Sequence, residues 1–343
     1  MMLKLENKIS SWAALGAKID SLCNSEAADP QFNQVLIQAE SQNGWFTKEQ
    51  VLFALKAWSE LLTSDNLNNW LSSYDIVDST DKTVAVIAAG NIPLVGLHDA
   101  LAVLLSGNKL QLKLSSNDQV LLPYLLDLLI EIEPAWQDRI EIRKDEVKDY
   151  NAVIATGSDN TARYFEHYFK GKPHIIRRNR NSAAVLNGSE SEQELSGLAD
   201  DIFRYYGLGC RSVSKLYVPH NYDFDLLFKA VYKWKHLLEH KKYENNYDYN
   251  KAVFLMSQFK FLENGFFMIK EDERMSSPIA SVFYEYYDDI DELNDQLREI
   301  QDQIQCVVSS AGIANSLAFG SSQNPGLSDY ADGVDTLEFL LKL

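Results

Sequence analysis

Short hydrophobic runs alternate with helical patterns along the middle of the chain. Thr83–Ala89 is a continuous apolar run that ends at Gly90-Asn91-Ile92-Pro93, and residues 98–105 follow with the composition of a buried helix. A second short run, 109–114, completes a strand–helix–strand unit. Strands that alternate with helices predict an α/β fold with a mostly parallel, doubly wound sheet, whose ligands bind beyond the carboxyl ends of the strands.

The same alternation continues to the end of the chain, after a helical pattern over residues 1–74. We expect further helices at 119–132, 190–206, 223–240 and 288–304, and further strands at 140–142, 152–156, 183–186, 215–218, 252–256, 266–269 and 279–286. The stretch 236–250 is rich in Lys, Glu, Asn and Tyr, which is typical of a solvated loop. The order of the elements predicts three parts: a helical segment at 1–74 that packs on the next part, a first doubly wound α/β domain at 75–200 and a second at 201–343.

Composition and charge exclude several classes of protein. The 343 residues are 46% hydrophobic and 24% charged, as in ordinary soluble globular proteins. A formal net charge of −17 disfavours nonspecific binding to nucleic acids, because phosphates are attracted by basic surfaces. Three widely spaced cysteines argue for a reducing compartment. The first residues lack the pattern of a signal peptide and no run is long enough for a membrane span, so we predict a cytoplasmic protein.

Cys210 is the candidate nucleophile. It lies in the run Gly207-Leu208-Gly209-Cys210-Arg211-Ser212-Val213-Ser214, between two glycines and a short polar stretch that leads into a strand. Glycines favour a tight turn that a substrate can approach. A single cysteine is more often a small buried hydrophobic residue, so its surroundings have to decide. Cys23 and Cys306 lack such surroundings.

Three other segments stand at the ends of predicted strands, where a ligand of this fold would bind. They are Asn91 before Pro93, Lys113 with Ser115, and the turn Gly157-Ser158, which opens a helix. Each has an ordinary alternative, because asparagines are common in turns, lysines on surfaces and serines at helix caps. The dinucleotide fingerprint with three glycines is absent, which disfavours an ordinary Rossmann dehydrogenase.

Taken together, these four segments resemble the aldehyde dehydrogenase superfamily, in the order that this superfamily has them. Within it, Ala89-Gly90-Asn91-Ile92-Pro93 and Lys113-Leu114-Ser115-Ser116-Asn117-Asp118 are most similar to the acyl-CoA reductases of the LuxC type, the fatty-acid-reductase component of bacterial luminescence. The resemblance implies that 75–200 binds a dinucleotide and that 201–343 is the catalytic domain. It implies these residue roles: Cys210 as nucleophile, Asn91 with the Cys210 backbone N–H as oxyanion hole, Lys113 and Ser115 at the adenine-side ribose or 2′-phosphate, and Gly157 and Ser158 at the pyrophosphate.

Two departures from the superfamily pattern bear on the reaction. The segment whose glutamate activates water in aldehyde-oxidising members reads Arg177-Arg178-Asn179-Arg180-Asn181-Ser182 here. Without that base, an acyl-enzyme would be hydrolysed only slowly, as a CoA-dependent enzyme requires. Arg177, Arg178 and Arg180 are candidate contacts for phosphates of CoA or the dinucleotide, with a solvated turn as the alternative. The glutamate that holds the nicotinamide ribose is also replaced, and only Glu273 lies near its place.

The resemblance therefore implies reduction of a fatty acyl-CoA thioester to the aldehyde through an acyl-cysteine, with NADPH, or NADH in its place, as cofactor, CoA as leaving group and no metal. An acyl-carrier-protein thioester or an acyl phosphate is an alternative substrate. A non-reducing acyl-transfer or scaffold subunit is an alternative of another class. A homo-oligomer and an acyl-activating or acyl-transferase partner enzyme are also expected, without nucleic acid or membrane span.

Overall fold

The chain forms two compact units, each with its own sheet. The computed structural model describes residues 3–24 and 29–343, and its two units are 1–178 with 326–343, and 179–325. The sequence pattern indicated a boundary near residue 200, whereas the units divide after residue 178. The reason is that the strand at 181–185 pairs with two strands of the second sheet, while the C-terminal residues return to the first unit.

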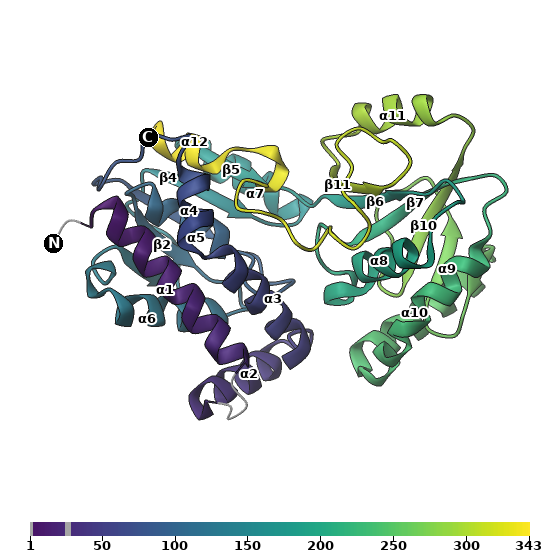
Figure 1. Ribbon diagram of the computed structural model, residues 1–343, viewed down its shortest axis with the longest axis horizontal. Helices are drawn as coiled ribbons and strands as arrows, with labels where there is room; N and C mark the ends of the chain where they lie inside the picture. The colour runs from purple at the N-terminus through teal and green to yellow at the C-terminus, as the bar shows by residue number, and fades with distance from the viewer. Residues whose placement is uncertain (1–2, 25–28) are drawn as a thin grey trace. The chain divides into compact units, whose positions relative to one another are not determined.

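The sheet of the first unit is entirely parallel and doubly wound, as the sequence predicts (Figure 1). Its strand order is β3-β2-β1-β4-β5, so the order reverses beside β1. The strands are β1 (Thr83–Ile87), β2 (Lys109–Lys113), β3 (Ile140–Arg143), β4 (Ala152–Thr156) and β5 (His174–Arg177). Because all five run the same way, the loops that follow them meet at one edge, which is where doubly wound sheets bind ligands.

Helices surround this sheet. They are α1 (Leu5–Asn24), α2 (Pro30–Gln42), α3 (Lys48–Leu61), α4 (Ser64–Leu71), α5 (Leu97–Leu105), α6 (Leu121–Ile132), α7 (Asp159–Tyr168) and α12 (Thr336–Leu341), with 3₁₀ turns at Pro134–Trp136 and Ala331–Gly333. The helical character expected for 1–74 is confirmed in the part of this range that the structure describes. Buried Lys8 of α1 donates to the carbonyl oxygens of Val77 (3.1 Å) and Leu105 (3.2 Å), which ties α1 to the end of α5.

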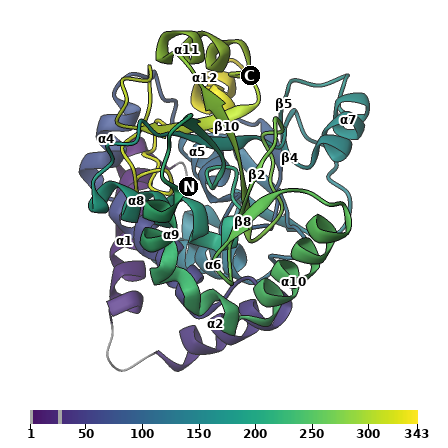
Figure 2. The same cartoon turned by 90° about the vertical axis from the view of Figure 1, so that its right-hand side faces the viewer.

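The second unit has a mixed sheet of order β11-β6-β7-β10-β9-β8, in which only β8 is antiparallel to its neighbour. Its strands are β6 (Asn181–Val185), β7 (Val213–Pro219), β8 (Phe261–Glu263), β9 (Met268–Glu271), β10 (Ser281–Tyr287) and β11 (Ile304–Ser309). Its helices are α8 (Glu192–Phe203), α9 (Phe224–Val231), α10 (Lys241–Met256) and α11 (Ile290–Glu299), with 3₁₀ turns at Arg204–Gly207 and Tyr232–Glu239. Figure 2 shows α11 on one side of this sheet and α9 and α10 on the other.

Part of the secondary structure predicted for the second unit is wrong. The expected loop at 236–250 and the expected strand at 252–256 both fall largely in α10. Tyr243, Tyr247 and Phe254 are buried at helical spacing, and this spacing outweighs the polar composition. The helix expected at 288–304 is shorter, because α11 ends at Glu299 and β11 begins at Ile304; β5 and β8 were not foreseen either.

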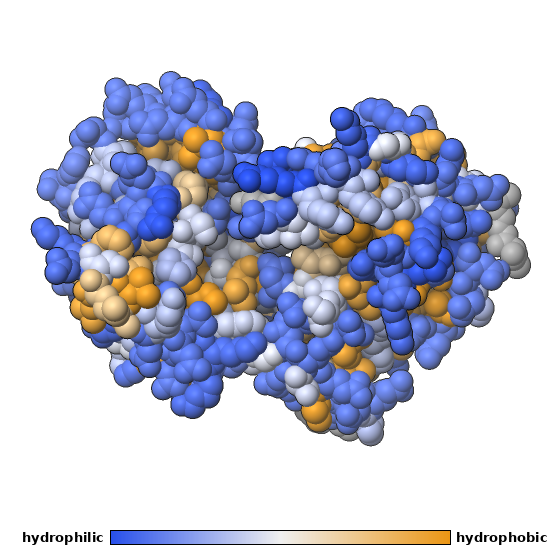
Figure 3. Space-filling model, turned by 180° about the vertical axis from the view of Figure 1, so that it is seen from behind, coloured by the Kyte–Doolittle hydropathy of each residue, from blue (hydrophilic) through white to orange (hydrophobic). Residues whose placement is uncertain are grey.

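Hydrophilic side chains cover most of the face in Figure 3, with smaller hydrophobic areas between them. This surface agrees with the high content of acidic residues. In the described part of the chain, no helix combines the length and the hydrophobicity that crossing a membrane would require.

Candidate active site

Cys210 occupies a tight turn between α8 and β7. The N–H of Leu208 donates to the carbonyl of Tyr205 (3.0 Å) and that of Ser212 to the carbonyl of Gly209 (3.0 Å). The second bond closes a β-turn with Cys210 and Arg211 at its two central positions. The sequence prediction of a turn at this cysteine is confirmed.

The backbone that leads into this turn is strained. Tyr205, Tyr206 and Gly207 follow one another in the left-handed region, with φ of 53°, 58° and 76°. Bulky residues rarely adopt this conformation, so packing has to hold it. Both tyrosine rings are buried, and that of Tyr206 stacks on His240 at 4.7 Å between centroids. Such strain is typical of functional sites, where neighbouring structure fixes an unfavourable backbone.

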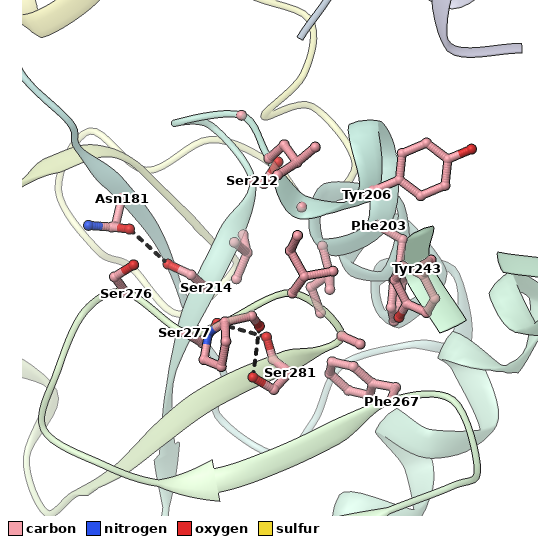
Figure 4. A pocket seen from close by; sticks show the side chains of 18 of the residues that line it. Asn181, Phe203, Tyr206, Ser212, Ser214, Tyr243, Phe267, Ser276, Ser277 and Ser281 are labelled. Carbon is pink, nitrogen blue, oxygen red and sulfur yellow. Dashed lines mark hydrogen bonds between the residues drawn. The ribbon is translucent and has the colours of Figure 1, made fainter. Parts of the chain in front are cut away.

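A cavity of about 250 Å³ opens beside the turn, lined by residues on both sides of Cys210, namely 207–209 and 212–214. Figure 4 shows two kinds of wall. One side carries polar side chains, Asn181, Ser214, Ser276, Ser277 and Ser281, and the other carries Phe203, Tyr206, Tyr243 and Phe267. No aspartate or glutamate is among the lining residues. Cys210 itself is not among the lining residues, so the cavity, which no carboxylate lines, adjoins the cysteine turn.

Beneath the turn lies a buried pair of side chains that the sequence did not indicate. Ser182 of β6 is fully buried, and its hydroxyl donates to the carbonyl oxygen of Cys210 (2.9 Å). The sulfur of Cys306 on β11 lies 3.2 Å from the same hydroxyl. Burial raises the pKa of Cys306, which favours its neutral thiol, a donor to Ser182. No local motif marks Ser182, because its partners come from distant parts of the chain.

Lys215, which follows Ser214 in β7, belongs to the core of the second unit. Its side chain is fully buried and its ammonium forms an ion pair with Glu285 (2.5 Å) and a hydrogen bond to the carbonyl of Asp272. Burial lowers the pKa of Lys215, against the attraction of Glu285. These contacts fix β7 to its neighbour β10, so Lys215 supports the turn from below and takes no part in the cavity.

The loops after β1 and β2 are packed closely at the edge of the first sheet. A side chain at Gly90 would bring its Cβ within 2.7 Å of the Ser115 hydroxyl, so the position requires glycine. Asp118 is buried and accepts hydrogen bonds from the N–H groups of Leu94 (3.3 Å) and Leu121 (3.4 Å). Burial raises the pKa of Asp118 to about 6. These contacts hold the loop of exposed Asn91 against the segment that follows Lys113.

The predicted cofactor residues lie at this edge, at or after the ends of β2 and β4. Lys113 ends β2 and is partly exposed, and its ammonium has no hydrogen bond or ion pair to any described residue. Gly157 follows β4 directly, and Ser158 caps α7 by accepting from the N–H of Thr161 (3.5 Å). Capping explains this serine without a ligand, whereas the unpartnered Lys113 has no such structural role.

The three arginines do not form one cluster. Arg177 is buried, and its guanidinium donates to Asp99 (2.7 Å), the carbonyl of Ala331 (2.7 Å) and Thr336 (2.9 Å). Arg178 is exposed and pairs with Glu166. Arg180 lines the cavity of the second unit and makes long contacts to the carbonyls of Gln301 (3.4 Å) and Ile304 (3.3 Å). Arg177 thus anchors the C-terminal segment, a position that does not favour the phosphate role predicted for it.

The described residues include no group of three or more His, Cys, Asp and Glu side chains that could hold a metal ion.

Comparison with solved structures identifies the fold. A putative aldehyde dehydrogenase from Anabaena variabilis superposes with a TM-score of 0.61 at 14% identity, over 90% of this chain and 75% of that one. An aldehyde dehydrogenase from Physcomitrella patens gives a TM-score of 0.65 at 13% identity, over 90% and 73% of the two chains. One from Mycobacterium tuberculosis, in complex with NAD+, gives 0.63 at 12% identity, over 89% and 73%. The predicted fold, that of the aldehyde dehydrogenases, is confirmed.

Comparison of sequences identifies the family. The long-chain acyl-protein thioester reductase 2 of Photobacterium leiognathi is 25% identical over 225 residues, which are 57% of this chain and 46% of that protein. The chain therefore spans less than half the length of that curated relative. The family model described as acyl-CoA reductase (LuxC) matches residues 25–226, more than half of the chain. Because this match covers more than half of the chain, the chain belongs to the LuxC family of acyl-CoA reductases.

Proposed function

We propose that this chain reduces a fatty acyl-CoA thioester to the aldehyde through an acyl-cysteine at Cys210, with NADPH as the reductant. The observation that carries the proposal is the strained turn that presents Cys210 beside a cavity, in a chain of the LuxC family. The net reaction consumes the thioester, NADPH and one proton, and yields aldehyde, CoA and NADP+.

The chemistry of Cys210 accounts for both halves of the reaction. Its thiolate forms a bond to the acyl carbon, the bond from that carbon to the CoA sulfur breaks, and CoA leaves as the thiolate. Bound NADPH supplies the hydride that brings the acyl carbon to the oxidation level of the aldehyde. The bond between the resulting thiohemiacetal carbon and Cys210 then breaks, which releases the aldehyde and restores the thiolate.

The residues at the edge of the first sheet fit a dinucleotide. The order of the strands reverses beside β1, so the loops after β1 and β4 flank the usual nucleotide position. The unpartnered ammonium of Lys113 suits a 2′-phosphate or a ribose hydroxyl, with Ser115 beside it. The turn at Gly157 and Ser158 opens α7, and a helix N-terminus favours a pyrophosphate. Asn91 as an oxyanion donor stays a prediction from the resemblance.

The absence of a carboxylate from the lining of the cavity supports a reductase over a hydrolytic enzyme. A carboxylate near the acyl-cysteine would activate water and release a carboxylic acid. The aromatic side of the cavity suits an apolar part of the substrate, and its hydroxyl groups suit polar atoms near the thioester. A homo-oligomer and an acyl-activating or acyl-transferase partner enzyme rest on the family resemblance alone.

The name of the Photobacterium relative, an acyl-protein thioester reductase, favours a second candidate substrate, an acyl group carried as a thioester on a protein. The same cysteine would attack it, and only the leaving group would differ. The rate constants kcat/KM for one acyl group on CoA and on a carrier protein distinguish the two substrates.

The nucleophile is tested with myristoyl-CoA and NADPH. We expect Cys210→Ala to abolish both covalent acylation and aldehyde formation, because the proposed acyl intermediate is attached to the sulfur of Cys210. Cys23→Ala, in α1 of the other unit, is the matched control and should keep both activities. Acyl labelling that persists in Cys210→Ala would refute the assignment, and acylation of the wild type without aldehyde would indicate a non-reducing acyl-transfer subunit.

A further inference from the structure

The peptide between Cys210 and Arg211 is held from one side only. It is the central peptide of the β-turn that the bond from Ser212 to Gly209 closes, and the turn itself bonds neither of its polar groups. Its carbonyl oxygen accepts from buried Ser182 (2.9 Å). Since C=O and N–H of a trans peptide point in opposite directions, the N–H of Arg211 points away from Ser182. Among the residues that the structure describes, no acceptor bonds this N–H.

Irregularities on both sides of β6 bring Ser182 to this carbonyl. The register of β6 with β7 shifts between Ser182 and Ala183, and that of β6 with β11 shifts between Ile304 and Val307. A shifted register marks a bulge, and bulges next to active sites direct a side chain to a place that a regular strand would not reach. The second shift contains Cys306, whose sulfur lies 3.2 Å from the Ser182 hydroxyl.

We propose that Ser182 is a positioning residue that fixes the Cys210–Arg211 peptide, so that the N–H of Arg211 donates to the oxyanion formed on the acyl group at Cys210. This inference rests on the proposed function. When the thiolate of Cys210 forms its bond to the acyl carbon, the π electrons of the carbonyl move to its oxygen. The negative oxygen then needs donors that are already aligned. Collapse returns these electrons to the C=O bond and expels the leaving group.

A second buried serine of the same sheet allows the proposed role of Ser182 to be distinguished from a purely structural role. Ser309 of β11 is another buried serine whose hydroxyl donates to a strand carbonyl, that of Val185 (2.8 Å), within the same sheet. This hydrogen bond joins β11 and β6, as the contact between Cys306 and Ser182 does, but it does not involve the Cys210 turn. Ser309→Ala therefore measures what the loss of a buried serine hydroxyl costs without any effect on the oxyanion.

The experiment compares two reactions of Cys210 in the wild type, Ser182→Ala and Ser309→Ala. The first is acylation by p-nitrophenyl octanoate, which passes through an oxyanion and needs neither CoA nor a nicotinamide. The second is alkylation by iodoacetamide, which attacks a saturated carbon and forms no oxyanion. Both are followed as modification of the Cys210 peptide by mass spectrometry, and kcat and KM for myristoyl-CoA are measured in parallel.

We expect Ser182→Ala to slow acylation about tenfold or more and to lower kcat with little change in KM, while alkylation changes less than about twofold. Ser309→Ala should leave both reactions near the wild type. Equal slowing of acylation and alkylation, or no slowing of either, would overturn the inference. If Ser182→Ala does not fold, Ser182→Cys replaces it, because a thiol of similar size is a much weaker donor. A wild type that neither the ester nor myristoyl-CoA acylates would contradict the proposed function itself.

Discussion

Two basic side chains at the same edge of the first sheet have opposite surroundings. Arg177 is buried and bonded to three partners, whereas Lys113 is partly exposed with no ion pair to a described residue. The sequence placed both at strand ends, because an apolar run followed by polar residues locates the end of a strand. It could not tell them apart, since the partners of Arg177 lie 78 and more positions away along the chain. Ser182 escaped notice for the same reason.

The difference predicts the effect of removing the ammonium of Lys113. We expect Lys113→Ala to weaken the binding of NADPH about tenfold more than that of NADH, because a charge-assisted hydrogen bond to a 2′-phosphate is lost. Titration of the free enzyme with each cofactor measures both dissociation constants. Lys109→Ala, at the other end of β2 with an ion pair to Asp81 (3.8 Å), is the control and should change neither. An equal loss of affinity for both cofactors would indicate that Lys113 contacts the ribose. No loss for either cofactor would indicate that Lys113 does not contact the cofactor.

At the scale of elements, strongly periodic or wholly apolar segments were predictable and mixed ones were not. The five-residue strands β1 and β4 are buried on both faces, so their apolar runs stood out. The helix α10 did not stand out, because two of its four buried residues are tyrosines and a third is an asparagine, within a charged sequence. The loops between elements were harder still. The hydrogen bonds that Asp118 accepts from Leu94 and Leu121 hold two loops together, and the pattern of hydrophobic and polar residues does not predict them.

Asp118 makes the stability of this loop pair depend on pH. Burial raises its pKa to about 6 in the folded protein, whereas an aspartate in an unfolded chain titrates at about 3.9. The folded state therefore binds the proton more tightly, so the free energy of unfolding falls as pH rises through this range. Between pH 5 and pH 7.5 the loss amounts to about 1 kcal/mol. We expect Asp118→Asn to lack this decrease, which urea unfolding at the two pH values measures.

The control for Asp118 has the opposite sign. The hydrogen bond from Lys56 lowers the pKa of Asp20, so this carboxylate contributes stability that is lost as pH falls. Both pH 5 and pH 7.5 lie above this lowered pKa, so Asp20→Asn should differ from the wild type by the same amount at the two pH values, and this difference should shrink only at lower pH. If Asp118→Asn follows the pH dependence of the wild type, then the loop pair does not depend on the protonation of Asp118.

At the scale of the whole molecule, the order of the motifs predicted the aldehyde dehydrogenase fold but not the division of the chain into its two units. The motifs lie at the ends of strands, and the hydrophobic pattern predicts these strands and their order along the chain. The boundary depends on which strands pair, and β6 joins the second sheet through strand neighbours that lie 31 and more positions away along the chain. The return of residues 326–343 to the first unit depends on buried contacts of Arg177.

The central claim is that the chain forms an acyl-cysteine that is hydrolysed only slowly. No carboxylate that could activate water lines the cavity beside the Cys210 turn. The most direct measurement is the intact mass of the protein over time after incubation with myristoyl-CoA in the absence of NADPH. We expect one acyl group per chain, absent from Cys210→Ala, that persists in buffer and disappears when CoA or NADPH is added, with aldehyde formed only in the second case. No adduct, or a rapid return to the unmodified mass with release of the fatty acid, would contradict the claim.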